Sequence, residues 1–193
     1  MKRLLHQILQ YLQLGSRPER PALTHDHPHD VGPADIPEIL TPEQVGSALF
    51  STFAKIEELD GARDELARSV DIDRNSFNWE LWYLRAFAVE CALQVFYGNE
   101  AVVSRVLTSF YSHYNKVFEL YPAVKATHDA RRQEYVHAWH TNHPATPLYA
   151  VGKVFARACG LDGCAVTAIE AVDLFTALLE GTKKGLSRIQ LQE

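Results

Sequence analysis

The stretch FNWELWYLRAFAVECALQVFY, residues 77–97, decides the fold of this chain. Apolar and aromatic residues recur in it so densely that a helix turning by about 100° per residue has no wide polar face. Glu80, Glu90 and Gln94 share one narrow sector of such a helix, whereas Arg85 falls on the opposite side among apolar residues. A helix that is apolar nearly all round has to be covered by other elements. We therefore expect a buried central helix over residues 77–97.

The remaining sequence supplies amphipathic helices that could cover this centre. Thr41, Pro42 and Gln44 predict a helix start with a capping box, because Thr is a good N-cap and Gln follows three residues later. Pro122 and Pro147 each predict the first turn of a further helix. The positions that these patterns turn towards the core are Val103, Val106, Phe110, Tyr114, Val117, Phe118 and Tyr121, then Val124, His128, Arg131, Tyr135, Ala138 and Trp139, then Leu148, Val151, Val154, Phe155 and Ala158.

A last long helix is expected between Asp162, which could cap it, and Gly181, which would end it. Its predicted core positions are Val166, Ile169, Val172, Phe175 and Leu179. No segment of the chain alternates convincingly between apolar and polar residues, so no strand is expected.

These elements predict an all-α fold, an irregular helical bundle of five to seven helices around the central helix. We divide the chain into an amphipathic N-terminal helix (1–15), an extended Pro-rich and His-rich arm (16–40), the helical-bundle domain (41–181) and a basic C-terminal tail (182–193). The arm contains five prolines between residues 16 and 40, which makes continued helix improbable there.

The N-terminal helix is the clearest candidate for contact with a partner. It places Leu4, Leu5, Ile8 and Leu12 on one face, together with Tyr11. Because it is separated from the bundle by the arm, it could dock on its own domain, on a second copy of the chain in a homodimer or other homo-oligomer, or on another protein. A membrane surface is less consistent with it, since such helices carry more Lys and Arg on the polar face.

Composition excludes several classes of protein. The formal net charge of −5 disfavours a dedicated nucleic-acid binder, which would carry a basic excess. No transmembrane segment is expected, because charged residues interrupt the longest apolar run. The absence of a signal-peptide pattern and the odd number of cysteines, three, favour a reducing, cytoplasmic location.

One pattern resembles a metal site. Glu134, His137 and His140 follow one another at intervals of three, the spacing by which a helix presents a carboxylate and imidazoles to a transition metal. A ferritin-like centre needs this pair on two helices, and the sequence has it once; the favourable charge of imidazolium at a helix C-terminus is the alternative explanation. A second group of possible metal ligands, His25, His27 and His29, lies in the arm. We expect these histidines to bind a metal only weakly. Either no cofactor or a transition metal is therefore expected.

Three further features leave alternatives open. Arg85 is a buried charge that needs a carboxylate from a neighbouring helix, such as Glu170 or Asp173, or else an anionic ligand. Cys159 and Cys164 could pair, bind a metal or act independently. The aromatic residues around Trp79 and Trp82 could fill the core or line a pocket between helices.

The sequence contains no nucleophile elbow, phosphate-binding loop or zinc-protease motif, so we expect a protein that is not an enzyme. The leading hypothesis is a cytoplasmic helical binding protein, an accessory, assembly or regulatory factor that acts through protein contacts. The first alternative is a metalloprotein that uses Glu134, His137 and His140. The second is a small-molecule sensor with an aromatic pocket between helices.

Overall fold

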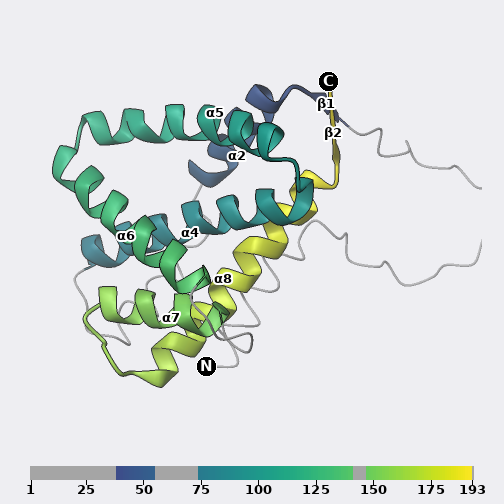
Figure 1. Cartoon of the computed structure of the whole chain (residues 1–193). Helices are drawn as coiled ribbons and strands as arrows, with labels where there is room; N and C mark the ends of the chain where they lie inside the picture. The colour runs from purple at the N-terminus through teal and green to yellow at the C-terminus, as the bar shows by residue number, and fades with distance from the viewer. Residues whose placement is uncertain (1–37, 55–73, 141–146, 193) are drawn as a thin grey trace, which may run out of the picture.

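The structure, a computed structural model, describes residues 38–54, 74–140 and 147–192. Within these ranges the chain forms a bundle of six helices with one small pair of strands, which confirms the all-α prediction (Figure 1). The elements are β1 (Glu38–Leu40), α2 (Pro42–Ala54), α4 (Arg74–Tyr97), α5 (Glu100–Glu119), α6 (Pro122–His140), α7 (Pro147–Ala158), α8 (Ala165–Leu186) and β2 (Ile189–Leu191). The predicted N-terminal helix and nearly all of the arm lie outside the described residues.

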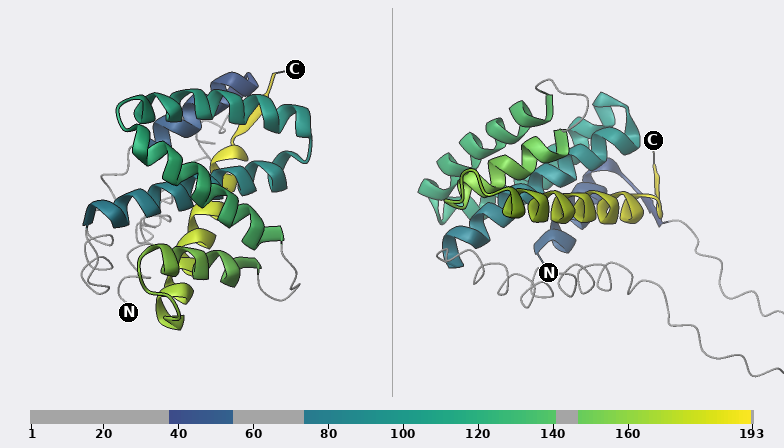
Figure 2. Two further views of the ribbon diagram at one scale, coloured as in Figure 1. Left: turned by 60° about the vertical axis from the view of Figure 1, so that its left-hand side comes forward. Right: turned by 90° about the horizontal axis from the view of Figure 1, so that it is seen from below.

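Helix α4 is the buried centre that the sequence predicts. It contacts α5, α6, α7 and α8, and α2 packs on α5 (Figures 1 and 2). Phe77, Leu84 and Leu93, spread along α4, are at most 1% exposed. Since its neighbours cover it on several sides, α4 can be apolar nearly all round, and the few polar groups it carries must find partners inside the protein.

The predicted start of α2 is confirmed in detail. The backbone N–H of Thr41 donates to Oε1 of Gln44 at 2.9 Å, and the N–H of Gln44 donates to Oγ1 of Thr41 at 3.3 Å. This reciprocal pair is a capping box, which satisfies two backbone donors at the helix N-terminus. Asn99 caps α5 in a related way, because its Oδ1 accepts from the N–H groups of Ala101 and Val102.

The C-terminal part of the chain differs from the prediction. Cys164, and not Asp162, occupies the N-cap position of α8, and its side chain accepts no capping hydrogen bond from the helix backbone. The helix runs to Leu186, beyond the predicted end at Gly181. A glycine inside a helix costs only about 1 kcal/mol, which the complete burial of Leu186 can offset.

The expectation of no strand was wrong. Strands β1 and β2 pair in parallel, with Glu38 opposite Ile189 and Leu40 opposite Leu191. Each strand has only three residues, too few for an alternating pattern to be recognised, and the partners lie far apart in the sequence. The ladder fixes the start of the described chain beside the C-terminal end of α8.

None of the helices in the described ranges combines the length and the apolar character needed to cross a membrane.

Helices α7 and α8 approach each other closely at Gly152. A Cβ atom built there would lie 2.2 Å from the carbonyl oxygen of Ala168 and 2.9 Å from Cγ2 of Val172. Small residues, Ala168 and Ala171, form the buried side of α8 near this crossing. The two helices therefore pack almost backbone to backbone, which leaves the larger side chains of α8 to point elsewhere.

We predict that Gly152→Ala lowers the free energy of unfolding by about 1–3 kcal/mol, because the new methyl group would displace the α8 backbone. Gly185→Ala is the matched control on α8: its Cβ would meet nothing within 4 Å. That substitution should leave stability unchanged or raise it by up to about 1 kcal/mol. Urea unfolding followed by circular dichroism measures both, and equal effects of the two substitutions would contradict the close packing.

Candidate functional site

The two carboxylates of α4 bind two consecutive arginines of α6. Arg131 donates through Nε to Oε2 of Glu80 at 2.8 Å and through Nη2 to Oε1 at 2.9 Å. Arg132 makes the equivalent pair with Glu90, with an Nη2–Oε2 distance of 2.8 Å. Both pairs are bidentate, the geometry in which a guanidinium binds a carboxylate most specifically. The pairs hold α6 on α4 at two points.

Each pair extends to a further helix. Arg131 also donates to Glu134 at 2.6 Å, and Glu134 accepts a second bond from Arg157 of α7 at 3.0 Å. The Tyr111 hydroxyl of α5 donates to Glu90, and the Arg132 guanidinium lies 5.9 Å from the centre of the Tyr111 ring. Burial raises the pKa of Glu80 above its ordinary value, although Arg131 opposes this shift. The network therefore joins α4, α5, α6 and α7, and its partners are all protein groups.

We predict that Arg131→Met lowers the free energy of unfolding by about 3 kcal/mol, because it leaves the Glu80 carboxylate buried without its cation. The double variant Glu80→Leu, Arg131→Met should recover most of that loss, since it removes both charges. The exposed pair of Glu43 and Arg105 provides the control, and Arg105→Met should change stability little. A double variant no more stable than Arg131→Met would refute this account.

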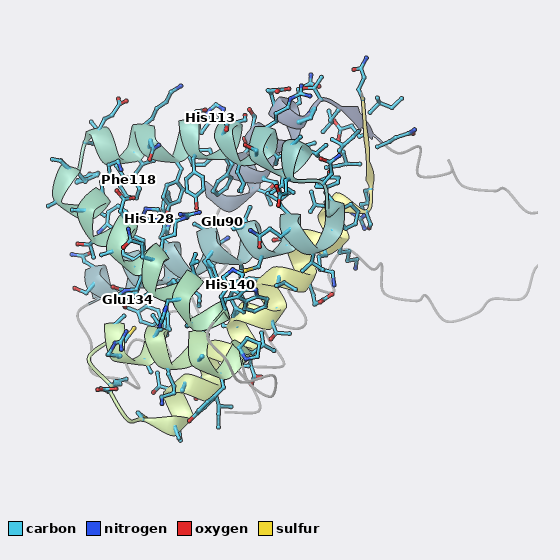
Figure 3. All side chains as sticks on the ribbon, viewed as in Figure 1. Glu90, His113, Phe118, His128, Glu134 and His140 are labelled. Carbon is cyan, nitrogen blue, oxygen red and sulfur yellow. The ribbon has the colours of Figure 1, made fainter. Side chains whose placement is uncertain are left out.

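His128 lies in an enclosure of aromatic rings. Its ring centre is 5.4 Å from that of Tyr83 on α4, and 5.0 Å and 5.2 Å from those of Tyr114 and Phe118 on α5. Figure 3 shows Glu90, His128 and Phe118 in the space that α4, α5 and α6 enclose, with Glu134 farther along α6 towards α7. Burial lowers the pKa of His128 below its ordinary value, although the carboxylates of Asp129 and Glu90 act in the opposite direction. The enclosure thus favours the neutral imidazole.

We predict that the protein loses stability as the pH falls below about 6.5, the pKa of an unfolded histidine, because the unfolded chain then binds a proton that native His128 resists. His128→Phe should reduce this loss between about pH 7 and pH 5, since it removes the group that titrates. His140→Gln, at an exposed position of the same helix, is the control for the loss of a histidine, and His128→Phe should change the slope more than it does. Denaturant unfolding at a series of pH values measures the slope, and an identical slope in His128→Phe would exclude the mechanism.

The predicted metal ligands occupy α6, but Glu134 is engaged by Arg131 and Arg157. His137 and His140 are exposed in the last turn of the helix. No group of three or more His, Cys, Asp or Glu side chains within the described residues is arranged to hold a metal ion. Metal binding by Glu134, His137 and His140 stays a prediction. To bind a metal, the Glu134 carboxylate would have to break its ion pairs with Arg131 and Arg157.

The other predicted features lie as follows. Burial lowers the pKa of Arg85 to about 10, and neither Glu170 nor Asp173 contributes to this shift. Trp79 and Trp82 pack edge to face with ring centres 5.9 Å apart, and Trp82 also contacts the ring of Tyr114. These contacts fill the core around both tryptophans.

Cys159 and Cys164 are free thiols. Burial raises the pKa of Cys159 to about 12. A hydrogen bond from the Thr167 hydroxyl lowers the pKa of Cys164 at the start of α8. The two thiols therefore lie in different environments, one buried and one near the surface.

The prediction for the core side of α8 was wrong at two positions. Val166 and Ile169 are 51% and 53% exposed. The buried positions near them are instead Thr167, Ala168 and Ala171. The close crossing at Gly152 requires small residues on the inner side, so the larger apolar residues of this part of α8 face outwards.

Three acidic residues lie close to these two residues in the sequence. Asp162, Glu170 and Asp173 lie near them on α8 and the loop before it, and within the described ranges Glu170 and Asp173 form no ion pair. Burial raises the pKa of Glu170, and the carboxylate of Asp173 adds to the shift. We call the exposed pair Val166 and Ile169 with these three carboxylates the α8 face.

A cleft of about 150 Å³ adjoins the α8 face. Tyr149 and Lys153 of α7 line one side of it, and Ala165 and Ala168 of α8 line the other. Tyr149 is itself 36% exposed, so it extends the apolar surface from α8 to α7. The cleft gives the face a concave edge beside its protruding side chains.

Further exposed apolar residues are Ile39 in β1 and four residues at helix ends. Val95 and Phe96 are in the last turn of α4, and Leu120 and Tyr121 are between α5 and α6. Exposed apolar residues at such positions are common in monomeric proteins. Among the described residues, the α8 face combines two exposed apolar side chains of one helix with nearby carboxylates and a cleft that has Lys153 on its α7 side, which makes it the candidate binding site.

Comparisons of the chain with models of protein families, with curated proteins and with solved structures found no match. Contacts, burial and charge in this chain therefore have to support any functional assignment.

Proposed function

We propose that the protein is a non-enzymatic, cytoplasmic helical binding protein that binds a basic amphipathic helix of a protein partner at the α8 face. One observation carries the proposal: Val166 and Ile169, which the sequence pattern assigns to the core, are on the surface. The two residues lie in the first two turns of α8. Large apolar side chains lose free energy by facing water, and contact with a partner would recover it.

The chemistry of the face specifies the partner. Val166 and Ile169 are three residues apart and lie about 60° apart around α8, so they form a short ridge. A helix with apolar residues at intervals of three and four would pack on this ridge and place a side chain towards the cleft beside Tyr149. The carboxylates of Glu170 and Asp173 would favour Lys or Arg on the flank of that helix.

The network on α4 and α6 supports a structural role better than a catalytic one. Its carboxylates and guanidinium groups bind one another, and none of them lines the cleft beside Tyr149. It keeps the helices in place and thereby gives the α8 face a rigid foundation. Rigid surfaces bind with a smaller loss of conformational freedom.

We predict that a labelled Leu-Lys peptide designed as a basic amphipathic helix binds the full chain, whereas a Leu-Glu peptide of the same pattern does not. Val166→Ser with Ile169→Ser should weaken the binding at least about tenfold, because apolar contact area is lost at both positions. Added salt should also weaken it. Fluorescence anisotropy measures the affinities.

Val95→Ser provides the matched control for this experiment. Val95 lies in the last turn of α4 and is 59% exposed. It therefore resembles Val166 in exposure but lies outside the α8 face. Circular dichroism should show that the variants remain folded. Equal affinities of the α8-face variant and wild type for the Leu-Lys peptide would reject the proposed site.

A further inference from the structure

The chain carries a segment whose chemistry matches the α8 face. Residues 1–15, MKRLLHQILQYLQLG, contain Lys2, Arg3 and His6 and no Asp or Glu. The sequence predicts an amphipathic helix over residues 2–14 with Leu5, Ile8 and other apolar side chains on one face. This segment lies outside the described residues. It has the two properties that the proposed partner needs, an apolar side and a positive charge.

The position of β1 determines where the segment is tethered. The N–H of Glu38 donates to the carbonyl oxygen of Arg188 at 3.1 Å, so the first described residue lies beside the C-terminal end of α8. From there to Ile169 the distance along the helix is about 29 Å, at 1.5 Å per residue. The arm therefore has to span about 29 Å from Glu38 to reach the α8 face.

The connecting chain has a suitable length. Residues 15–37 separate the predicted helix from β1. The sequence predicts an extended arm with five prolines here, and a Pro-rich chain rises by about 3.1 Å per residue, so its reach is up to about 70 Å. Because this reach exceeds the required span of about 29 Å, the arm can bring the segment to the α8 face, and the tether raises the effective concentration of the segment there above that of a separate copy in solution.

We infer that residues 2–14 dock on the α8 face of their own chain, with the apolar side of the segment on Val166 and Ile169 and its basic end near Glu170 and Asp173. This inference rests on the proposed function: residues 2–14 bind the proposed site when no partner is bound. The docked segment makes the protein self-inhibited, because a partner helix has to displace it before binding. A second copy of the chain would supply the same segment only at its dissolved concentration, which is far lower than the tethered one.

Hydrogen exchange of the full chain tests the docking. Amides of residues 4–12 should exchange at least about tenfold more slowly in the chain than in a free peptide of residues 1–15, since docking orders them. The protection should disappear in the Val166→Ser, Ile169→Ser variant and persist in Val95→Ser. Equal exchange in chain and peptide overturns the inference, as does protection that survives the α8-face substitutions.

Dilution separates the two possible sources of the segment. Protection that stays constant over about a tenfold dilution supports docking within one chain, because the effective concentration of a tethered segment does not depend on protein concentration. Protection that falls on dilution would show a second copy as the occupant and overturn the inference.

The Leu-Lys peptide distinguishes this inference from the proposed function. In the Leu5→Asp, Ile8→Asp variant, its affinity for the full chain should rise at least about threefold, because the site is no longer occupied. An unchanged affinity that still depends on Val166 and Ile169 would refute the docking and leave the proposed binding site intact. Absence of peptide binding to this variant would reject the proposed function itself.

Discussion

The pairing of α6 with α4 through two bidentate ion pairs is the constraint on which the rest of the structure depends. A buried carboxylate stays ionised at low cost when a cation and hydrogen bonds compensate both of its oxygens. Glu80 and Glu90 obtain these from Arg131 and Arg132, which follow each other in α6. This requirement determines the position of α6 along α4 and its rotation about its own axis. The Tyr111 hydroxyl and Arg157 then attach α5 and α7 to the same network.

Much of this fold could be predicted from the sequence because local signals and burial agree. The dense apolar run of residues 77–97, the capping box at Thr41 and the prolines at 122 and 147 gave the helices and several of their starts. The ion pairs were not predicted, although one signal was available: two glutamates in one sector of a buried helix require cations elsewhere. Periodicity gives no information about which helix supplies them, so the partners could be recognised only in three dimensions.

The exposure of Val166 and Ile169 was missed for a different reason. A hydrophobic stripe indicates which side of a helix avoids water, but it does not distinguish the core of the chain from the surface of a partner. Which side of α8 is buried depends on Gly152 of α7. Because Gly152 has no side chain, α7 packs closely on the alanines of α8, and Val166 and Ile169 lie on the exposed side. A contact between two helices thus reverses the interpretation of a pattern in one of them. The cleft beside Tyr149 also arises from that packing and has no signature in the sequence.

The parallel ladder between β1 and β2 has a consequence for how the protein is made. Glu38 and its neighbours pair with residues 189–191, so β1 has no partner while the intervening chain is being synthesised. At ordinary elongation rates this interval lasts roughly 8–30 s. Helices α4, α5 and α6 can associate during that time, because their contacts join segments close in sequence. The ladder therefore closes late in biosynthesis, and only then does the N-terminal segment acquire a fixed point of attachment near α8.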